Sequence, residues 1–266
     1  SESVRLHLVS DVPVGVFLSG GIDSGSLAGL IKDAGASGLQ GVTIAFNEFE
    51  GRHENEAPVA AEIARNYGIR HHVRTITRQE FEADLPHIFS SMDQPSIDGI
   101  NTWYASKAAV ELGLKVVISG VGGDELFYGY SSFHQLPRLV ACWRRLSHIP
   151  GAHTMVNMAL EQLARRTGNP RWRWFARLAG SMYGAYWLRR GLFSPDELPE
   201  LMGDDWSSEL MSNSDPKILL EKMVGSLPSD PMAAVGQLES MAYLRNQLLR
   251  DSYWASMAHS LELHTQ

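Results

Sequence analysis

Six consecutive residues, Ser19 to Ser24 (SGGIDS), combine small, flexible and acidic side chains in an order that suits binding of a phosphate together with a cation. They follow a short apolar run, Val14 to Leu18, that is typical of a buried parallel strand, and a helix is expected from Ser24 onward. Glycines let a backbone approach an anion closely, and the first amides of a helix have no partners within it. The order strand, glycine turn, helix therefore predicts an anion site made of backbone N–H groups. Asp23 would repel a phosphate unless it holds a divalent cation that the phosphate shares.

The six residues fit neither of two common phosphate-binding motifs. A Walker A loop needs Gly-Lys-Ser/Thr after its glycines, and a dinucleotide fingerprint needs a second glycine where Ile22 lies. The segment resembles instead the pyrophosphate-binding loop of the ATP pyrophosphatase superfamily. Together with Pro13 to Val16 before it, the segment looks like the synthetase domain of glutamine-dependent asparagine synthetases. The alternative is that the two glycines form only a tight turn that packs a helix on a strand.

A second glycine turn, Ser119 to Glu125 (SGVGGDE), follows another expected strand, Leu114 to Ile118. Because the carboxyl ends of parallel strands meet at one edge of a sheet, both turns are expected at that edge. Asp124 could then share a Mg²⁺ ion with Asp23, and helix N-capping is an alternative role for it. With Gly129 and Tyr130 after it, this turn resembles the second signature of asparagine synthetases.

The resemblance implies roles for residues in and around both turns. The residues implied to contact ATP are Leu18, Ser19, Gly20, Gly21, Asp23, Ser24, Phe46, Ser119 and Gly120. Asp23 and Asp124 are the implied Mg²⁺ ligands, and Asp124 and Glu125 are the implied catalytic residues, placed to meet a substrate ammonium group. Val121 departs from the family pattern, because many asparagine synthetases carry a glutamate there and valine cannot transfer protons. This departure concerns whether aspartate is the acid substrate more than whether the protein uses ATP.

A third stretch, Ala255 to Glu262 (ASMAHSLE), resembles the family's run before an Arg-x-Pro sequence, whose two ends correspond to His264 and Gln266 here. Family members continue into a helical segment with a catalytic lysine, and they carry a glutaminase domain with an N-terminal cysteine nucleophile. We therefore expect a chain that is truncated at its C-terminus. Because it starts at Ser1 without a methionine, we also expect it to be a piece of a longer protein.

Composition restricts the classes of function. The chain has 266 residues, of which 44% are hydrophobic and 20% charged, as in a globular protein with its own core. The net charge of −7 argues against a nucleic-acid surface, and no apolar run approaches the roughly 18 residues of a membrane span. Cys142 is the only cysteine, so the sequence predicts neither a disulfide framework nor a Cys-x-x-Cys metal site. It favours a reducing, cytoplasmic location, and Cys142 is expected in the core.

Apolar patterns and the resemblance together predict an α/β fold: a doubly wound parallel sheet of the adenine nucleotide alpha hydrolase type, followed by a mainly helical region. Further strands are expected at 41–46 and 69–76, and residues 4–8 alternate as an edge strand would. Thr77 is expected to cap a helix that carries Phe81, Leu85, Ile88 and Phe89 inward. After Pro137 no strand is expected, and helices are predicted at 139–146, 155–166, 172–186, 216–223 and 232–254. The predicted domains are an α/β nucleotide-binding part, 1–136, and a helical part, 137–266.

The resemblance implies an ATP-dependent carbon–nitrogen ligase. A carboxylate, aspartate or a related acid, would attack the α-phosphorus of ATP to give an acyl-adenylate and pyrophosphate, and ammonia would then displace AMP. The implied cofactors are ATP and Mg²⁺, and the ammonia would come from a glutaminase domain outside this sequence. No nucleic-acid or membrane partner is expected, and a homodimer is left open. Two alternatives remain: a non-catalytic ATP-binding module, or a related pyrophosphatase-loop enzyme that acts on another acid or on tRNA.

Overall fold

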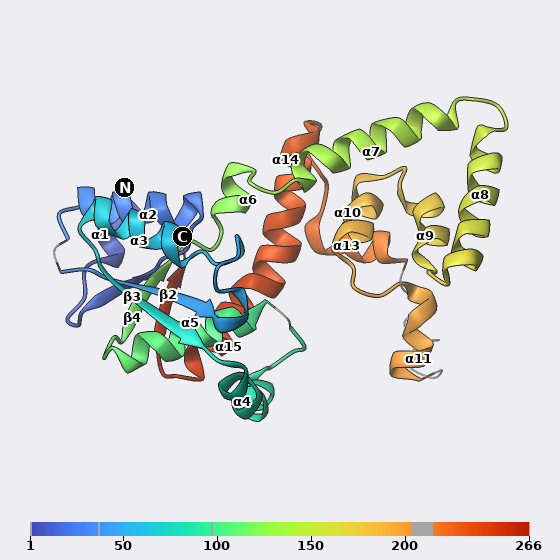
Figure 1. Cartoon of the computed structure of the whole chain (residues 1–266). Helices are drawn as coiled ribbons and strands as arrows, with labels where there is room; N and C mark the ends of the chain where they lie inside the picture. The colour runs from blue at the N-terminus through green and yellow to red at the C-terminus, as the bar shows by residue number, and fades with distance from the viewer. Residues whose placement is uncertain (1, 37, 97, 204–214, 266) are drawn as a thin grey trace. The chain divides into compact units, whose positions relative to one another are not determined.

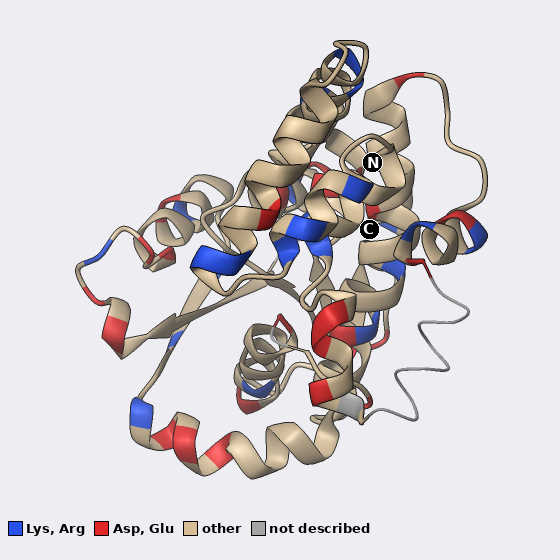
Figure 2. Ribbon diagram, turned by 90° about the vertical axis from the view of Figure 1, so that its right-hand side faces the viewer, with Lys and Arg blue, Asp and Glu red and all other residues tan. Residues whose placement is uncertain are grey.

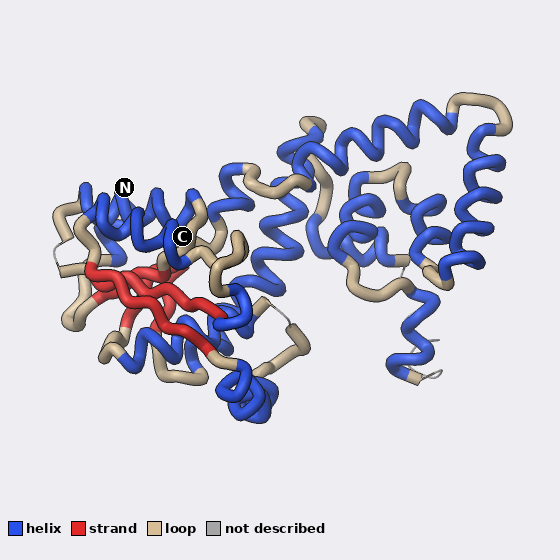
Figure 3. The backbone as a smooth tube through the Cα atoms, in the orientation of Figure 1, coloured by secondary structure: helices blue, strands red, loops and turns tan. Residues whose placement is uncertain are grey.

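The computed structural model describes residues 2–36, 38–96, 98–203 and 215–265 (Figure 1), so the expectation about Gln266 lies outside the described part. The chain forms two compact units, one of residues 1–124 with 245–266 and one of residues 125–244. Figure 3 shows the strands in the first unit, whereas the described part of the second is helices and loops. These units differ from the predicted domains chiefly in where residues 245–266 belong. The division at residue 136 stays a proposal.

The first unit is built on a five-stranded sheet whose strands are all parallel, in the order β3-β2-β1-β4-β5. The strands are β1 (Val14–Phe17), β2 (Gln40–Phe46), β3 (Arg70–Ile76), β4 (Val116–Ser119) and β5 (Glu262–Thr265). Central β1 pairs Val16 with Gly41 of β2 on one side and with Ile118 of β4 on the other. The direction of strand order reverses between β1 and β4, and ligands of such sheets bind outside the carboxyl ends at that point. The predicted doubly wound α/β fold is confirmed.

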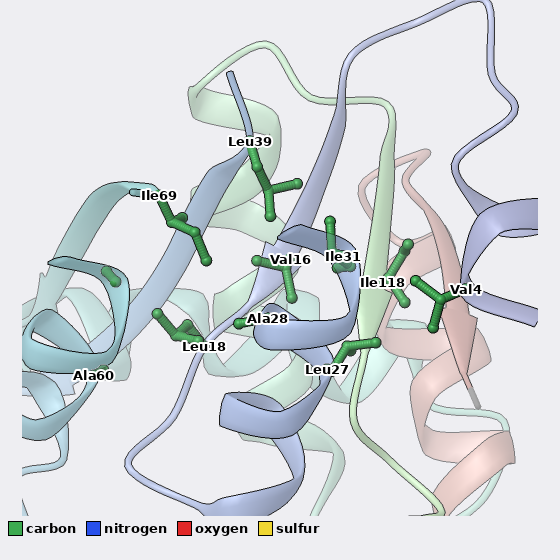
Figure 4. Close-up of a cluster of buried hydrophobic side chains, with 11 residues drawn as sticks. Val4, Val16, Leu18, Leu27, Ala28, Ile31, Leu39, Ala60, Ile69 and Ile118 are labelled. Carbon is green, nitrogen blue, oxygen red and sulfur yellow. The ribbon is translucent and has the colours of Figure 1, made fainter. Parts of the chain in front are cut away.

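Helices cover both faces of the sheet. On one face lie α1 (Glu2–His7), α2 (Ile22–Asp33) and α3 (Ala57–Tyr67), and Figure 4 shows their side chains meeting those of the strands. Val4, Leu27 and Ile31 pack there against Val16 and Ile118. The fully buried positions of Leu27 and Ile31 recur at the helical interval, so the apolar side of α2 fixes that helix directly above β1.

The opposite face is covered by α4 (Arg78–Ser91), α5 (Gly99–Glu111) and α15 (Leu249–Met257). Ile88, Tyr104 and Trp254 from these three helices pack together with Ile76 of β3. The short 3-10 helix η1 (Asn47–Phe49) follows β2. Thr77 caps α4 as predicted, since its side chain accepts a hydrogen bond from the Glu80 amide.

The second unit begins within the short helix α6 (Gly123–Phe127) and is helical in its described part. Its elements are α7 (Ser132–Ser147), α8 (Ala152–Thr167), α9 (Arg171–Leu178), α10 (Met182–Arg190), η2 (Pro195–Glu197), α11 (Leu198–Met202), α13 (Pro216–Val224) and α14 (Pro231–Leu238). Phe133, Val140, Tyr186, Val235 and Leu238 form the centre of its core. The π-helical segment η3 (Glu239–Leu248) follows α14, and α15 continues it into the first unit.

Two sequence-based expectations about strands are wrong. Residues 2–7 form α1 and not an edge strand, because Val4 and Leu8 lie on one helical face toward the core while Leu6 between them is 67% exposed. The chain also forms β5 after residue 137, pairing Val116 through Ser119 with Glu262 through Thr265. Its four residues alternate between charged, apolar and polar types, so the segment lacks the apolar run by which buried strands are recognised.

Several helix boundaries also differ from expectation. The predicted helix 172–186 is two helices, because Ser181 caps α10 through the Gly184 amide and ends the continuity after α9. The helix after the first glycine turn begins at Ile22, and the one after the second begins at Gly123. Asp124 therefore lies inside a first turn and is not an N-cap residue.

Two side chains predicted to be buried are exposed. Phe89 on α4 is 64% exposed, because Ile88 beside it takes the inward position. Cys142 is also exposed, since the neighbouring Trp143 and Val140 occupy the buried side of α7. Among the described residues, no helix is both long and apolar enough to cross a lipid bilayer. Figure 2 shows where Lys and Arg and where Asp and Glu lie along the ribbon.

Candidate active site

The first glycine turn joins β1 to α2 and directs its backbone amides toward oxygen atoms. Gly21 is the N-cap residue of α2, and its extended backbone conformation (φ −79°, ψ 158°) starts the helix at Ile22. The Ser19 amide donates to Ser24 Oγ (3.1 Å), and the Gly21 amide donates to Ser19 Oγ (3.1 Å). The two serine hydroxyls lie 2.8 Å apart. The turn is thus a cluster of donors at the positive end of a helix dipole, which is the arrangement that binds anions.

The second glycine turn packs directly on the first. A Cβ added to Gly120 would lie 3.1 Å from the Ser24 nitrogen and 3.4 Å from Asp23 Cβ. A Cβ added to Gly123 would lie 2.7 Å and 2.8 Å from the two carboxylate oxygens of Asp23. The absence of side chains at both glycines therefore lets the two turns touch. This contact confirms that both turns lie at the same carboxyl edge of the sheet.

The electrostatics of the contact centre on Asp23. Burial raises the pKa of its carboxyl group, and the nearby carboxylate of Asp124 raises it further. Asp23 and Asp124 come from different turns, yet their charges act on each other at a half-buried position. A carboxylate whose pKa is raised by a second one nearby is arranged as it would be around a shared cation.

Hydrogen bonds from the neighbouring strands hold the end of β1. The Leu18 amide donates to the Val42 carbonyl (2.9 Å), and the Leu18 carbonyl accepts from Thr43 Oγ1 (2.6 Å). Thr43 Oγ1 also lies 2.8 Å from His71 Nε2, and since the hydroxyl hydrogen is directed to Leu18, the imidazole is the donor in this second bond. Both peptide groups of Leu18 are thereby fixed immediately before the glycine turn begins.

The remaining residues predicted to contact ATP lie at the ends of strands. Phe46 is the last residue of β2 and is half-buried, with its ring edge-to-face with those of Phe49 and Tyr104. Ser119 ends β4 and is buried, and its Oγ accepts from the Val121 amide (3.3 Å). The structure therefore places all nine of these residues in the first unit, at or after the carboxyl ends of β1, β2 and β4.

Glu125 begins the second unit, so its surroundings are those of that unit. It is 2% exposed, and Tyr130 donates its hydroxyl hydrogen to Glu125 Oε1 (2.8 Å). The guanidinium of Arg190 lies over the Tyr130 ring at 4.8 Å from its centroid. Arg190 also forms an ion pair with the fully buried Glu239 (3.0 Å). Tyr130 thus links the second of the two predicted catalytic acids to Arg190, which pairs with Glu239.

The third stretch with a predicted family resemblance lies along α15 and β5. His259 contacts the Trp103 ring edge-to-face, with centroids 4.4 Å apart, and burial lowers its pKa, with Lys107 nearby lowering it further. His264 lies on β5, where its Nε2 is 2.8 Å from Glu262 Oε1. Both histidines make contacts within the first unit.

Sequence reasoning missed Glu56, which contacts the glycine turn, Thr43, which contacts Leu18 just before it, and His71, which contacts Thr43. Glu56 Oε2 accepts a hydrogen bond from the Gly20 amide (3.2 Å), although 36 positions separate the two residues. Nothing in their local sequence marks these residues, because their roles arise only when β2, β3 and α3 are assembled beside β1. Among the described residues, no group of three or more His, Cys, Asp or Glu side chains is arranged to hold a metal ion without further ligands.

Known proteins similar to this chain include asparagine synthetases. A family model described as asparagine synthase matches residues 1–265. The chain is 37% identical over 136 residues to "Asparagine synthetase [glutamine-hydrolyzing] 1" of Bacillus subtilis, covering 50% of the chain and 21% of that protein. It is 29% identical over 281 residues to a "Putative asparagine synthetase [glutamine-hydrolyzing]" of Mycobacterium bovis, covering 98% of the chain and 38% of that protein.

A relative with a different printed name also matches. The chain is 32% identical over 149 residues to "Amidase chyE" of Penicillium rubens, which covers 50% of the chain and 22% of that protein. The chain thus spans between about a fifth and two fifths of the length of these curated relatives.

Proposed function

This chain belongs to the asparagine synthase family, and on that premise we propose that its two glycine turns bind MgATP and that a carboxylate substrate is activated there as an acyl-adenylate. The observation that carries the proposal is the contact of Gly120 and Gly123 with Asp23 and Ser24. This contact lies at the carboxyl ends of two neighbouring parallel strands, where the strand order reverses and nucleotides bind in such sheets.

The phosphates would lie at the N-terminus of α2. The amides of the turn, which donate to side-chain oxygens in this structure, would supply hydrogen-bond donors to the phosphates together with the hydroxyls of Ser19 and Ser24. These donors are fixed in place before the reaction begins, so they can stabilise the charge that builds on a departing pyrophosphate. Leu18, whose backbone is held by Val42 and Thr43, sets the position from which the turn leaves the sheet.

The residues present fit a Mg²⁺ ion. Burial and the nearby Asp124 carboxylate raise the pKa of Asp23 in this structure, and a divalent cation between the two carboxylates would offset their repulsion. Two carboxylates leave several positions of an octahedral ion to phosphate oxygens and water, as is usual for Mg²⁺ with nucleotides. When bound, the ion would neutralise charge on the phosphates.

The chemistry proposed is amide formation in two steps. The substrate carboxylate attacks the α-phosphorus of ATP and pyrophosphate leaves, and ammonia then attacks the acyl carbon and AMP leaves. Glu125 is proposed to meet the substrate's ammonium group. The names of the relatives support glutamine as the source of ammonia through a glutaminase domain of a longer protein. The single cysteine supports a cytoplasmic location.

Calorimetry with MgATP tests the binding site. Asp23→Asn removes the charge of a proposed ligand while keeping its shape, so we expect at least about tenfold weaker Mg²⁺-dependent binding, the loss of one ion contact. Asp33→Asn, at the exposed far end of the same helix, is the matched control and should bind like the wild type. Equal affinity in all three proteins would show that Asp23 is not a metal ligand.

A second measurement separates a ligase from a non-catalytic nucleotide-binding module. The full-length parent protein is incubated with ATP, ammonia and candidate acids, and pyrophosphate, AMP and amide are measured. Release of pyrophosphate that depends on the acid identifies an adenylating ligase, whereas binding without release identifies the module.

The acid itself is tested at Val121, which is half-buried in the second turn. We propose aspartate or an aspartate-like acid. If the parent protein makes no asparagine and Val121→Glu does not restore it, aspartate is excluded and a different acid must be the substrate.

A further inference from the structure

The first glycine turn makes an amide hydrogen bond to a side chain from another element. Three successive amides of the turn donate to side-chain oxygens: those of Ser19 and Gly21 to serine hydroxyls, and that of Gly20 to the carboxylate of Glu56. Oxygen acceptors at these amides occupy the positions in which an anion site would hold phosphate oxygens. Hydroxyl and carboxylate acceptors differ in how they would interact with a phosphate bound at the turn.

A serine hydroxyl can accept from an amide and still donate its own hydrogen to a phosphate. An ionised carboxylate only accepts hydrogen bonds, and it repels a phosphate. All three acceptors occupy N–H groups of the turn, but only Glu56 does so with a negative charge that repels a phosphate.

The position of Glu56 is not explained by helix capping. It is the N-cap residue of α3, the position from which a side chain ordinarily accepts from the first amides of its own helix, but it makes no such bond. Its side chain reaches instead to Gly20, against which Glu56 and Val59 also pack: a Cβ added to Gly20 would lie 3.4 Å and 3.3 Å from their Cβ atoms. Because Glu56 is an exposed residue, its carboxylate can turn toward solvent without any rearrangement of the core.

We propose that the Glu56 carboxylate is an internal competitor for phosphate in the first glycine turn. It holds the Gly20 amide in the conformation of the bound state, and a phosphate group must displace it. This inference rests on the proposed function, because it assumes that the turn binds the phosphates of ATP. The proposal predicts that Glu56 lowers the affinity of the turn for both MgATP and pyrophosphate. The lower affinity would favour release of pyrophosphate after the reaction.

Calorimetry with magnesium pyrophosphate and with MgATP tests the competition in the chain as it exists. Glu56→Gln keeps an oxygen acceptor for Gly20 but removes the charge, and Glu56→Ala removes both. Both variants should bind both ligands more tightly, by about fivefold for one nearby unit charge in a water-like dielectric. Glu54→Gln is the matched control, because that exposed acid pairs with His53.

Unchanged or weaker binding in both Glu56 variants would overturn the proposal and make Glu56 a residue that supports the turn or the cation. If the wild type and all variants fail to bind either ligand, the proposed function fails with it. If the wild type binds and Glu56→Gln binds no tighter, only the competition is wrong.

The amide resonance of Gly20 gives a readout that needs no ligand. In a ¹H–¹⁵N spectrum, Glu56→Ala should move the Gly20 signal strongly, and Glu54→Gln should leave it in place. Titration of the wild type with pyrophosphate should move the same signal and release Glu56. A Gly20 signal that is indifferent to Glu56→Ala would show that the hydrogen bond does not form in solution and would overturn the proposal.

Discussion

The carboxylate of Asp23 lies against the α-carbon of Gly123, so that a Cβ at position 123 would come within 2.7 Å of Oδ1 and 2.8 Å of Oδ2. This contact joins two turns that are 100 positions apart in the chain. The Asp23 carboxylate can occupy this position only because Gly123 has no Cβ, an atom that every other residue type has. Glycine is therefore needed at position 123 for closeness of approach.

Gly123→Ala should consequently disturb the site. The added methyl group pushes the Asp23 carboxylate away from the contact, so we expect MgATP affinity to fall about tenfold and the free energy of unfolding to fall by about 1–3 kcal/mol, as for overpacked sites. Calorimetry and urea unfolding measure the two effects. Gly25→Ala is a suitable control, since its Cβ would meet only the flexible end of Ile63 at 3.4 Å. Equal affinity in Gly123→Ala and Gly25→Ala would contradict the contact.

Thr43→Val tests the hydrogen bond that holds Leu18, the residue just before the first glycine turn. Valine matches the shape of threonine but leaves the Leu18 carbonyl without its donor and His71 without its acceptor, both near the core. The expected loss is about 1–3 kcal/mol of unfolding free energy, the cost of unsatisfied buried groups. MgATP binding should weaken too, because the start of the turn is less well fixed.

Two further variants show whether the effect of Thr43→Val comes from loss of its hydroxyl. Thr43→Ser keeps the hydroxyl and should retain most of the binding affinity, whereas Thr75→Val, at an exposed position of β3, should change stability by less than about 0.5 kcal/mol. If Thr43→Ser is as weak a binder as Thr43→Val, the hydroxyl is not what positions the turn.

The sequence indicated the two glycine turns and their acidic residues, but not the residues of other elements that hold the first turn in place. Strand, glycine turn and acid follow one another locally, so their order could be recognised without knowledge of the fold. Glu56 and Thr43 act through contacts with β1 and its turn, which exist only after α3 and β2 have packed beside them. No local pattern carries that information.

The errors in secondary structure have a similar origin. Val4 and Leu8 fit both a strand and a helix, and it is their packing against α2 that selects the helix. β5 is too short and polar to be recognised alone, and it forms because β4 offers an unpaired edge. The assignment of residues 245–266 to the first unit follows from that pairing and from the packing of α15 on α5, which sequence patterns do not show.

Glu239→Gln tests the buried network of the second unit. Glu239 is fully buried and accepts hydrogen bonds from Ser132, Tyr186 and Arg190. Loss of its charge leaves the Arg190 guanidinium without a counter-ion, so we expect a loss of about 3–5 kcal/mol in urea unfolding. Glu161→Gln, an acid at an exposed arginine pair, should cost less than about 1 kcal/mol. Similar costs for both variants would show that the buried pair contributes no more than a surface one.

A pH dependence of stability is expected from the half-buried His71. Burial lowers the pKa of His71, and the neighbouring His72 lowers it further. Because the unfolded chain keeps the ordinary value of about 6.5, it binds more protons than the folded protein just below that pH. The contribution of His71 to stability is therefore complete above about pH 6.5 and is lost as the pH falls toward its folded pKa.

We therefore expect the free energy of unfolding to fall when the pH is lowered from 7 to 5.5, and His71→Gln to reduce that fall. Glutamine keeps an N–H donor for Thr43 Oγ1 but does not titrate, so the variant separates the proton from the hydrogen bond. Urea unfolding at both pH values measures the difference between the two proteins. His53→Gln, at a side chain that is 92% exposed, is the matched control. If His71→Gln and the wild type lose the same free energy over this range, protonation of His71 does not oppose folding, and His259, whose pKa burial also lowers, is the next histidine to replace.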